Sequence, residues 1–138
     1  MSDKPIQITE FDLERLRKLI ENAQHTEYRG SDYLARLQAE LDRAQIVPPQ
    51  AVPEAVVTMN STVALLDLET GEEETYTLVF PENADVSHGR ISILAPIGTA
   101  MLGYEVGDIF EWPVPAGVRR LRVERILYQP EAAGDYHL

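Results

Sequence analysis

Apolar residues in the first 45 positions recur at the spacing of amphipathic helices. Two groups of aliphatic side chains share this repeat: Leu13, Leu16 and Ile20, and then Leu34, Leu37 and Leu41. Thr9 and Ser31 precede the two groups, where a hydroxyl can cap the first turn of a helix. A polar connection, residues 24–30, separates them. The pattern predicts two helices of about 13 to 15 residues, packed as an antiparallel hairpin, a short coiled coil about 20 Å long.

The second half of the chain changes to the alternation typical of β-strands. Residues 62–68 and 73–80 flank the turn sequence ETGE, which predicts a β-hairpin. A short helix is predicted at 96–102, because Pro96 suits a helix start and Gly103 a helix end. Further strands are predicted at 90–94, 109–113 and 118–128. The expected fold is α+β, with this helix packed on an antiparallel sheet.

The sequence VPPQAVP at residues 47–53 separates the two patterns. Its three prolines fix backbone angles and remove hydrogen-bond donors, which favours an extended connection. We therefore expect a helical hairpin at 1–46, a proline-rich linker at 47–53 and a second domain at 54–138.

Charge and composition restrict the class of partner. The chain has 138 residues, no cysteine and a net charge of −11. Residues 1–45 carry 7 basic and 9 acidic side chains, and residues 46–138 carry 5 and 14. This balance disfavours direct nucleic-acid binding, because Lys and Arg supply most of the affinity for phosphates. No apolar run approaches the length of a membrane span, so the expected location is the cytoplasm.

The sequence contains no recognisable catalytic or cofactor motif. His25, His88 and His137 stand in separate segments without metal-ligand spacing. No glycine-rich phosphate loop follows a predicted strand. We therefore predict no catalytic residue, no cofactor and no metal, and we look for the function in a partner.

One cationic cluster occurs in the second half, at Arg119, Arg120, Arg122 and Arg125. Arginines suit bidentate contacts with carboxylates or phosphates, so the cluster could hold an acidic partner or a nucleotide. It could also offset the acidic strand start at residues 72–74, and we prefer this second interpretation.

The order of motifs between residues 90 and 128 resembles the C-terminal domain of Gre-type transcription factors. The pattern of those factors is Ser-Pro, a small-residue helix ending in Leu-x-Gly, Val-Gly-Asp, a Pro-x-Gly hairpin and a final strand ending in Tyr, and the residues of this segment resemble it in that order. The segments LDRAQIV (41–47), VVTMNSTV (56–63) and YQPEAAGDYHL (128–138) are similar to the Rnk family, the regulators of nucleoside diphosphate kinase, which are short relatives of the Gre factors. The resemblance covers nearly the whole chain.

This resemblance implies an FKBP-like C-terminal domain and a partner. The partner is bacterial RNA polymerase, contacted at a coiled coil of its β′ subunit beside the secondary channel. By position in the motif, the implied contact residues are Ser92, Leu94, Ala95 and Pro96, with Leu94 standing where Gre factors commonly carry Asp. We expect these residues to form an exposed edge whose substitution leaves the fold intact. The alternative is that Leu94 and Pro96 only end a strand and start a helix.

In Gre factors a much longer coiled coil carries acidic tip residues to the polymerase active centre for transcript cleavage. The tip of the predicted hairpin here contains Glu27, Tyr28, Arg29 and Asp32. A tip about four helical turns from its base cannot reach a deep active site, so we expect no cleavage stimulation.

Two alternatives remain open at this stage. The family name suggests direct binding to nucleoside diphosphate kinase. The FKBP-like fold suggests a peptidyl-prolyl isomerase, which needs a concave aromatic pocket and has only the fold analogy behind it.

Overall fold

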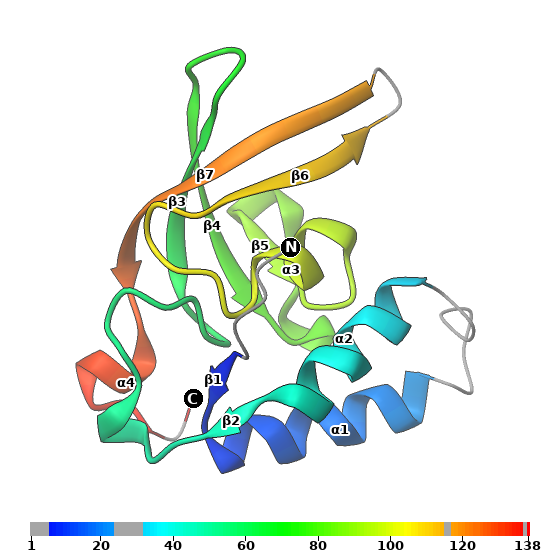
Figure 1. The fold of residues 1–138 in the computed structure, drawn as a ribbon, viewed down its shortest axis with the longest axis vertical. Coiled ribbons are helices and arrows are strands. Elements are labelled where there is room, and N and C mark those ends of the chain that lie inside the picture. The colour runs from blue at the N-terminus through cyan, green and yellow to red at the C-terminus, as the bar shows by residue number, and fades with distance from the viewer. Residues whose placement is uncertain (1–5, 24–31, 115–116, 137) are drawn as a thin grey trace.

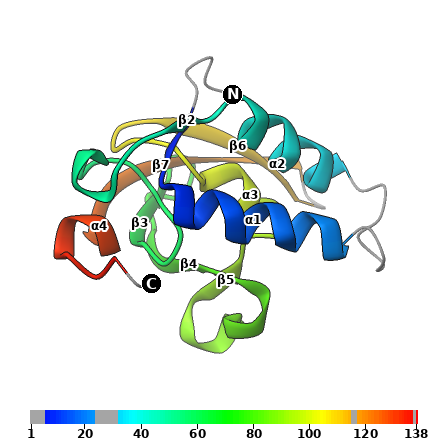
Figure 2. The same cartoon turned by 90° about the horizontal axis from the view of Figure 1, so that it is seen from below.

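The computed structural model describes residues 6–23, 32–114, 117–136 and 138. Two helices, α1 (Glu10–Ala23) and α2 (Asp32–Arg43), lie side by side, and α2 runs back along α1 (Figures 1 and 2). The Thr9 hydroxyl accepts a hydrogen bond of 3.1 Å from the N–H of Asp12, which confirms the predicted cap. Ser31 lies outside the described residues. All six aliphatic residues of the predicted stripes are buried.

A short pair of parallel strands joins the start of α1 to the end of α2. It consists of β1 (Gln7–Ile8) and β2 (Gln45–Ile46), with Gln7 opposite Gln45. The N–H of Gln45 donates to the carbonyl of Ile6 at 2.8 Å. The pair therefore fixes where the helical segment begins and ends.

The second half folds into a five-stranded sheet with two short helices. The sheet order is β5-β4-β3-β7-β6, so β5 and β6 form its edges (Figure 1). The strands are β3 (Thr62–Asp67), β4 (Glu73–Val79), β5 (Arg90–Ser92), β6 (Ile109–Val114) and β7 (Gly117–Tyr128); the helices are α3 (Pro96–Met101) and α4 (Pro130–Ala133). The predicted mixed helix-and-sheet class is confirmed, and so is the hairpin of β3 and β4.

The expectation of a purely antiparallel sheet is wrong, because β5 runs parallel to β4. Their register pairs Thr77 with Arg90 and Val79 with Ser92. The connection contains two single-turn 3-10 helices, Pro81–Asn83 and Val86–His88, which carry the chain back to lie beside Thr77 in the second half of β4. Such turns have no apolar periodicity, so the pattern did not indicate them. The expectation of one short helix is also incomplete, because α4 follows β7.

A single apolar cluster joins the helices to the sheet. Leu16 of α1 and Leu37 of α2 are 0% and 1% exposed, and they belong to the same cluster as Val63 of β3 and Met101 of α3. Residues on both sides of 47–53 therefore share one core. The two helices pack on the body of the protein instead of extending away from it.

The proline-rich segment is held against the rest of the chain. Residues Pro49–Ala51 form a 3-10 turn, and Val52 is buried. The side-chain amide of Gln129 donates to the carbonyls of Pro53 and Val56, at 2.8 and 2.6 Å. Prolines and these contacts together restrict the segment's conformation.

Candidate docking surface

The turn that follows edge strand β5 is fixed by its own hydrogen bonds. The Ser92 hydroxyl accepts from the N–H of Leu94 at 3.0 Å, and the Ser92 carbonyl accepts from the N–H of Ala95 at 3.0 Å. The N–H of Ile93 donates to Val79 of β4 at 2.9 Å. Because Pro96 then opens α3, the chain leaves the sheet edge in one defined direction.

Helix α3 closes tightly on this turn. The Thr99 hydroxyl donates to the carbonyl of Ile93 at 2.6 Å. At Gly98, an added Cβ would stand 2.1 Å from the Ser92 carbonyl oxygen, so only glycine allows this approach. The turn is therefore rigid before any partner binds.

The predicted contact residues differ in accessibility. Ser92 and Ala95 are half-buried, whereas Leu94 is 8% exposed and belongs to the core cluster. The expectation that Leu94 is an exposed contact is wrong. Ile93 and Leu94 both pack into the core at the point where the chain turns from β5 into α3. The Pro96 side chain lies outside the described residues.

We predict that Gly98→Ala destabilises the protein by about 1–3 kcal/mol, because the new methyl group must displace backbone. Helix propensity alone predicts the opposite sign, a gain of about 1 kcal/mol. Urea denaturation of this variant, with Ala100→Gly in the same helix as a measure of propensity, separates the two effects. A higher free energy of unfolding for Gly98→Ala would show that the backbone of the Ser92 turn can shift at little energetic cost.

The predicted hairpin tip falls largely outside the part of the chain that the structure describes. Glu27, Tyr28 and Arg29 lie outside the described residues. Asp32 is the first residue of α2, and its side chain is outside what the structure describes. The helices contain 14 and 12 residues, which corresponds to lengths of about 21 and 18 Å.

The arginines of β7 mainly contact acidic neighbours. Arg119 Nε lies 2.8 Å from Asp67 on β3, and Arg125 pairs with Glu73 on β4. Arg122 pairs with Glu124 on its own strand. The Asp67 carboxylate also accepts from two turn N–H groups, and these bonds together with Arg119 lower its pKa. The contacts agree with the preferred interpretation that the cluster offsets the acidic hairpin.

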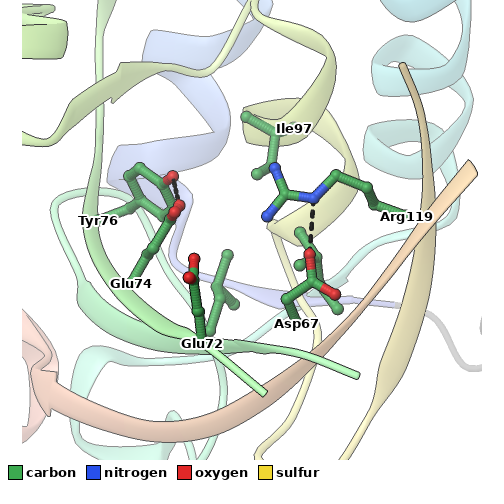
Figure 3. A pocket seen from close by; sticks show the side chains of 8 residues that line it. Asp67, Glu72, Glu74, Tyr76, Ile97 and Arg119 are labelled. Carbon is green, nitrogen blue, oxygen red and sulfur yellow. Dashed lines mark hydrogen bonds and ion pairs between the residues drawn. The ribbon is translucent and has the colours of Figure 1, made fainter. Parts of the chain in front are cut away.

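A hollow lies beside this ion pair, between the β3–β4–β7 face and α3 (Figure 3). The Tyr76 hydroxyl donates a hydrogen bond to Glu74 here. Burial of the phenol is the main cause that raises the pKa of Tyr76 to about 12, and the hydrogen bond to Glu74 is the second cause. The hollow has a wall made largely of carboxylates and Arg119. It is too tight to admit a water molecule. A prolyl ring needs a roomier apolar pocket, so this hollow gives the isomerase hypothesis no support.

One buried polar group was missed at the sequence level. Asp12, in the first turn of α1, is 2% exposed and pairs with Arg15. The Arg15 guanidinium stacks between the rings of Phe11 and Phe80 and donates to the carbonyl of Leu138 at 2.8 Å. The spacing of Asp12 and Arg15 was the available signal. The group ties α1 to the sheet and to the last described residue.

Within residues 6–23, 32–114, 117–136 and 138, His, Asp and Glu side chains do not assemble into a group of three that could hold a metal ion. In the same residues, each helix is too short or too polar to span a bilayer.

Two sequence profiles match the chain. Residues 52–128 match the C-terminal part of the transcription elongation factors GreA/GreB, and residues 4–47 match the Rnk N-terminus. The first match contains the whole five-stranded sheet, the Ser92 turn and α3. The second contains α1, α2 and the pair of β1 with β2.

Individual relatives extend this similarity. The chain is 45% identical to the regulator of nucleoside diphosphate kinase of Escherichia coli K12, over the full length of both proteins. It is 38% identical to the elongation factor GreA of Chelativorans sp., over 69% of this chain and 60% of that protein. The structure of a GreA/GreB elongation factor from Nitrosomonas europaea superimposes with a TM-score of 0.78 at 44% identity, over 89% of this chain and 99% of that one. Gfh1 of Thermus thermophilus gives 0.50 at 25% identity, over 91% and 100%.

Proposed function

The chain belongs to the GreA/GreB elongation factor family, in its Rnk branch, and from this premise we propose that it is a non-enzymatic regulator that docks on bacterial RNA polymerase. Docking uses the Ser92–Pro96 turn, at the β′ coiled coil beside the secondary channel. The observation that carries this proposal is the rigid, glycine-dependent turn at a sheet edge, in the position that the family resemblance assigns to polymerase contact. The cellular location that this implies is the cytoplasm.

The same proposal assigns different roles to the parts of the chain. Residues 54–138 form an FKBP-like docking domain, residues 47–53 a linker, and residues 1–46 an antiparallel helical hairpin that obstructs the channel entrance. The apolar cluster shared between helices and sheet supports an obstructing body of fixed shape. Rigidity matters because a blocking element that folds away would leave the entrance open.

Competition without cleavage follows from the short helices. Helices about 21 Å long, packed against their own sheet, cannot deliver a carboxylate deep into a channel. The protein and a long Gre factor would nevertheless need the same docking surface. The regulator would therefore displace Gre factors by mass action.

We expect this protein alone to leave a backtracked transcript uncut by polymerase, and an excess of it to inhibit cleavage stimulated by a Gre factor. The assay follows transcript length in backtracked complexes with magnesium while the ratio of the two proteins is varied. Transcript shortening by this protein alone, abolished in Glu27→Ala or Asp32→Ala, would show that the reach argument fails. Absence of both cleavage and competition would contradict docking on polymerase.

The Pro96→Ala variant tests the docking turn in the same assay. We expect it to lose competition while melting close to the parent protein. Pro49→Ala is the matched control, because Pro49 also opens a helical turn but lies in the linker. Equal competition by both variants would remove the Ser92–Pro96 assignment.

A second candidate is direct binding to nucleoside diphosphate kinase. The name of the Escherichia coli relative, regulator of nucleoside diphosphate kinase, favours it. A pull-down from bacterial lysate with this protein as bait distinguishes the two candidates, since polymerase subunits or the kinase would be recovered. Recovery of the kinase alone would put this second candidate first.

A further inference from the structure

A cleft of about 330 Å³ lies where α2, α3 and the β6–β7 ribbon meet. In Figure 1, α3 stands between α2 and the ribbon, and the contacts of α3 with both elements agree with this view. The cleft wall does not include the contact residues of the Ser92 turn. Its wall is formed by Arg36, Ala100, Tyr104, Ile109, Phe110, Glu111 and Arg120.

Two guanidinium groups from separate parts of the chain line this cleft. Arg36 belongs to α2 and Arg120 to β7, and both side chains are exposed. On β7, Arg119 and Arg125 have carboxylate partners. Among the described residues, no ion pair engages Arg36 or Arg120. In a chain with 23 acidic and 12 basic side chains, two such cations on one cavity indicate a site for an anion.

The rest of the wall is apolar with one acidic group. Phe110 and Tyr104 are buried and pack edge to face, with ring centroids 5.5 Å apart, and form a firm floor. Ile109 is 52% exposed and offers an apolar surface. Glu111 stands opposite Arg120 in the β6–β7 register. The Glu111 carboxylate can accept hydrogen bonds from N–H groups of a ligand, and it repels any anionic group that lies close to it.

We propose that this cleft binds a nucleoside phosphate. The phosphate lies between Arg36 and Arg120, the base packs on Ile109, and an amino or imino N–H of the base donates to Glu111. The volume is near the lower end for small-molecule sites, which suits a mononucleotide. A nucleic-acid chain is disfavoured, because every added phosphate meets the net charge of −11.

An acidic peptide strand added to the β6 edge is a different occupant, and the residues of β6 argue against it. Pro113 removes a donor from this edge strand, and Glu111 adds a charge of the wrong sign. Both features disfavour the addition of another strand to the β6 edge. The small ligand is therefore the proposal that the wall supports.

Isothermal titration with GDP and ADP at low salt tests the proposal on the full chain, without polymerase. We expect saturable binding, weakened at least about tenfold in Arg36→Ala and in Arg120→Ala, because each removes a charge-assisted hydrogen bond. Arg125→Ala, which removes the same charge from the same strand outside the cleft, should bind like the parent. Both cleft variants should melt normally, since both side chains are exposed.

Two further probes separate the parts of the ligand. Inorganic pyrophosphate should bind more weakly than GDP or ADP, and Glu111→Gln should tighten pyrophosphate binding by removing a repelling charge. Methyl resonances of Ala100 and Ile109 should shift on adding nucleotide. The proposal is overturned if neither nucleotide binds, if pyrophosphate binds as tightly as they do, if Arg125→Ala weakens binding equally, or if only an acidic peptide shifts those methyl groups.

Discussion

Replacing Leu94 with aspartate should unfold the protein, and loss of any partner binding would follow from that unfolding. Leu94 is 8% exposed within the core cluster. The change removes a buried aliphatic side chain and places a carboxylate among apolar groups. Loss of the aliphatic contacts alone costs about 2–5 kcal/mol, and the unpaired charge adds to it. That sum is comparable to the whole free energy of unfolding of a small domain, about 5–15 kcal/mol.

The measurement is guanidinium denaturation followed by circular dichroism. Leu94→Met is the matched control, since a volume-conserving replacement should cost less than about 1.5 kcal/mol. A Leu94→Asp protein with an unchanged midpoint and reduced polymerase binding would return Leu94 to the role of an exposed contact. If Leu94→Asp unfolds the protein, Leu94 is a core residue, and the proposed contact surface consists of Ser92, Ala95, Pro96 and the backbone of the turn.

Leu94 illustrates where sequence reasoning succeeded and where it stopped. The motif order located the turn correctly between strand and helix, because prolines and glycines determine local backbone geometry. Whether a leucine in that turn faces the core or a partner depends on the path of the chain after it. That path is set by the approach of Gly98 to the Ser92 carbonyl, a contact across six residues that no apolar period encodes.

The same difference between local and long-range contacts decides which helices and strands could be predicted. The stripes of α1 and α2 and the β3–β4 hairpin were predictable because each depends on residues close in sequence. The parallel pairing of β5 with β4 was not, because it depends on how an irregular ten-residue connection folds. The Arg36–Arg120 cleft was likewise beyond prediction. Its two arginines are 84 positions apart and meet only through the packing of α2 on α3.

Asp12 is a buried acid whose ionisation opposes folding. Burial raises its pKa from 3.8 to about 6, although the hydrogen bond and charge of Arg15 act in the opposite direction. The negative charge of Glu131, which is buried on α4, raises the pKa further. Glu131 itself accepts a hydrogen bond from the Thr58 hydroxyl at 2.6 Å. Two carboxylates are therefore enclosed at the junction of α1 and α4.

The sign of the resulting pH dependence follows from proton binding. Between pH 3.8 and about 6, the folded protein holds a proton on Asp12 that the unfolded chain has released. The contribution of Asp12 to stability therefore falls as the pH rises through this window, and the loss is complete above it. A difference of about two pKa units corresponds to about 3 kcal/mol. Asp67 and Asp85, whose pKa values are lowered, change stability in the opposite direction and at lower pH.

Asp12→Asn should isolate this effect, because asparagine keeps the shape of the side chain and cannot ionise. The expected result is that the free energy of unfolding of the parent, minus that of Asp12→Asn, falls by about 3 kcal/mol as the pH rises from below 4 to 7. Urea denaturation at a series of pH values measures it. Asp42→Asn is the matched control, because it makes the same chemical change at a carboxylate that is 59% exposed in its pair with Arg17. A parent-minus-Asp12→Asn difference that rises with pH would mean that Arg15 stabilises the ionised carboxylate by more than burial costs it.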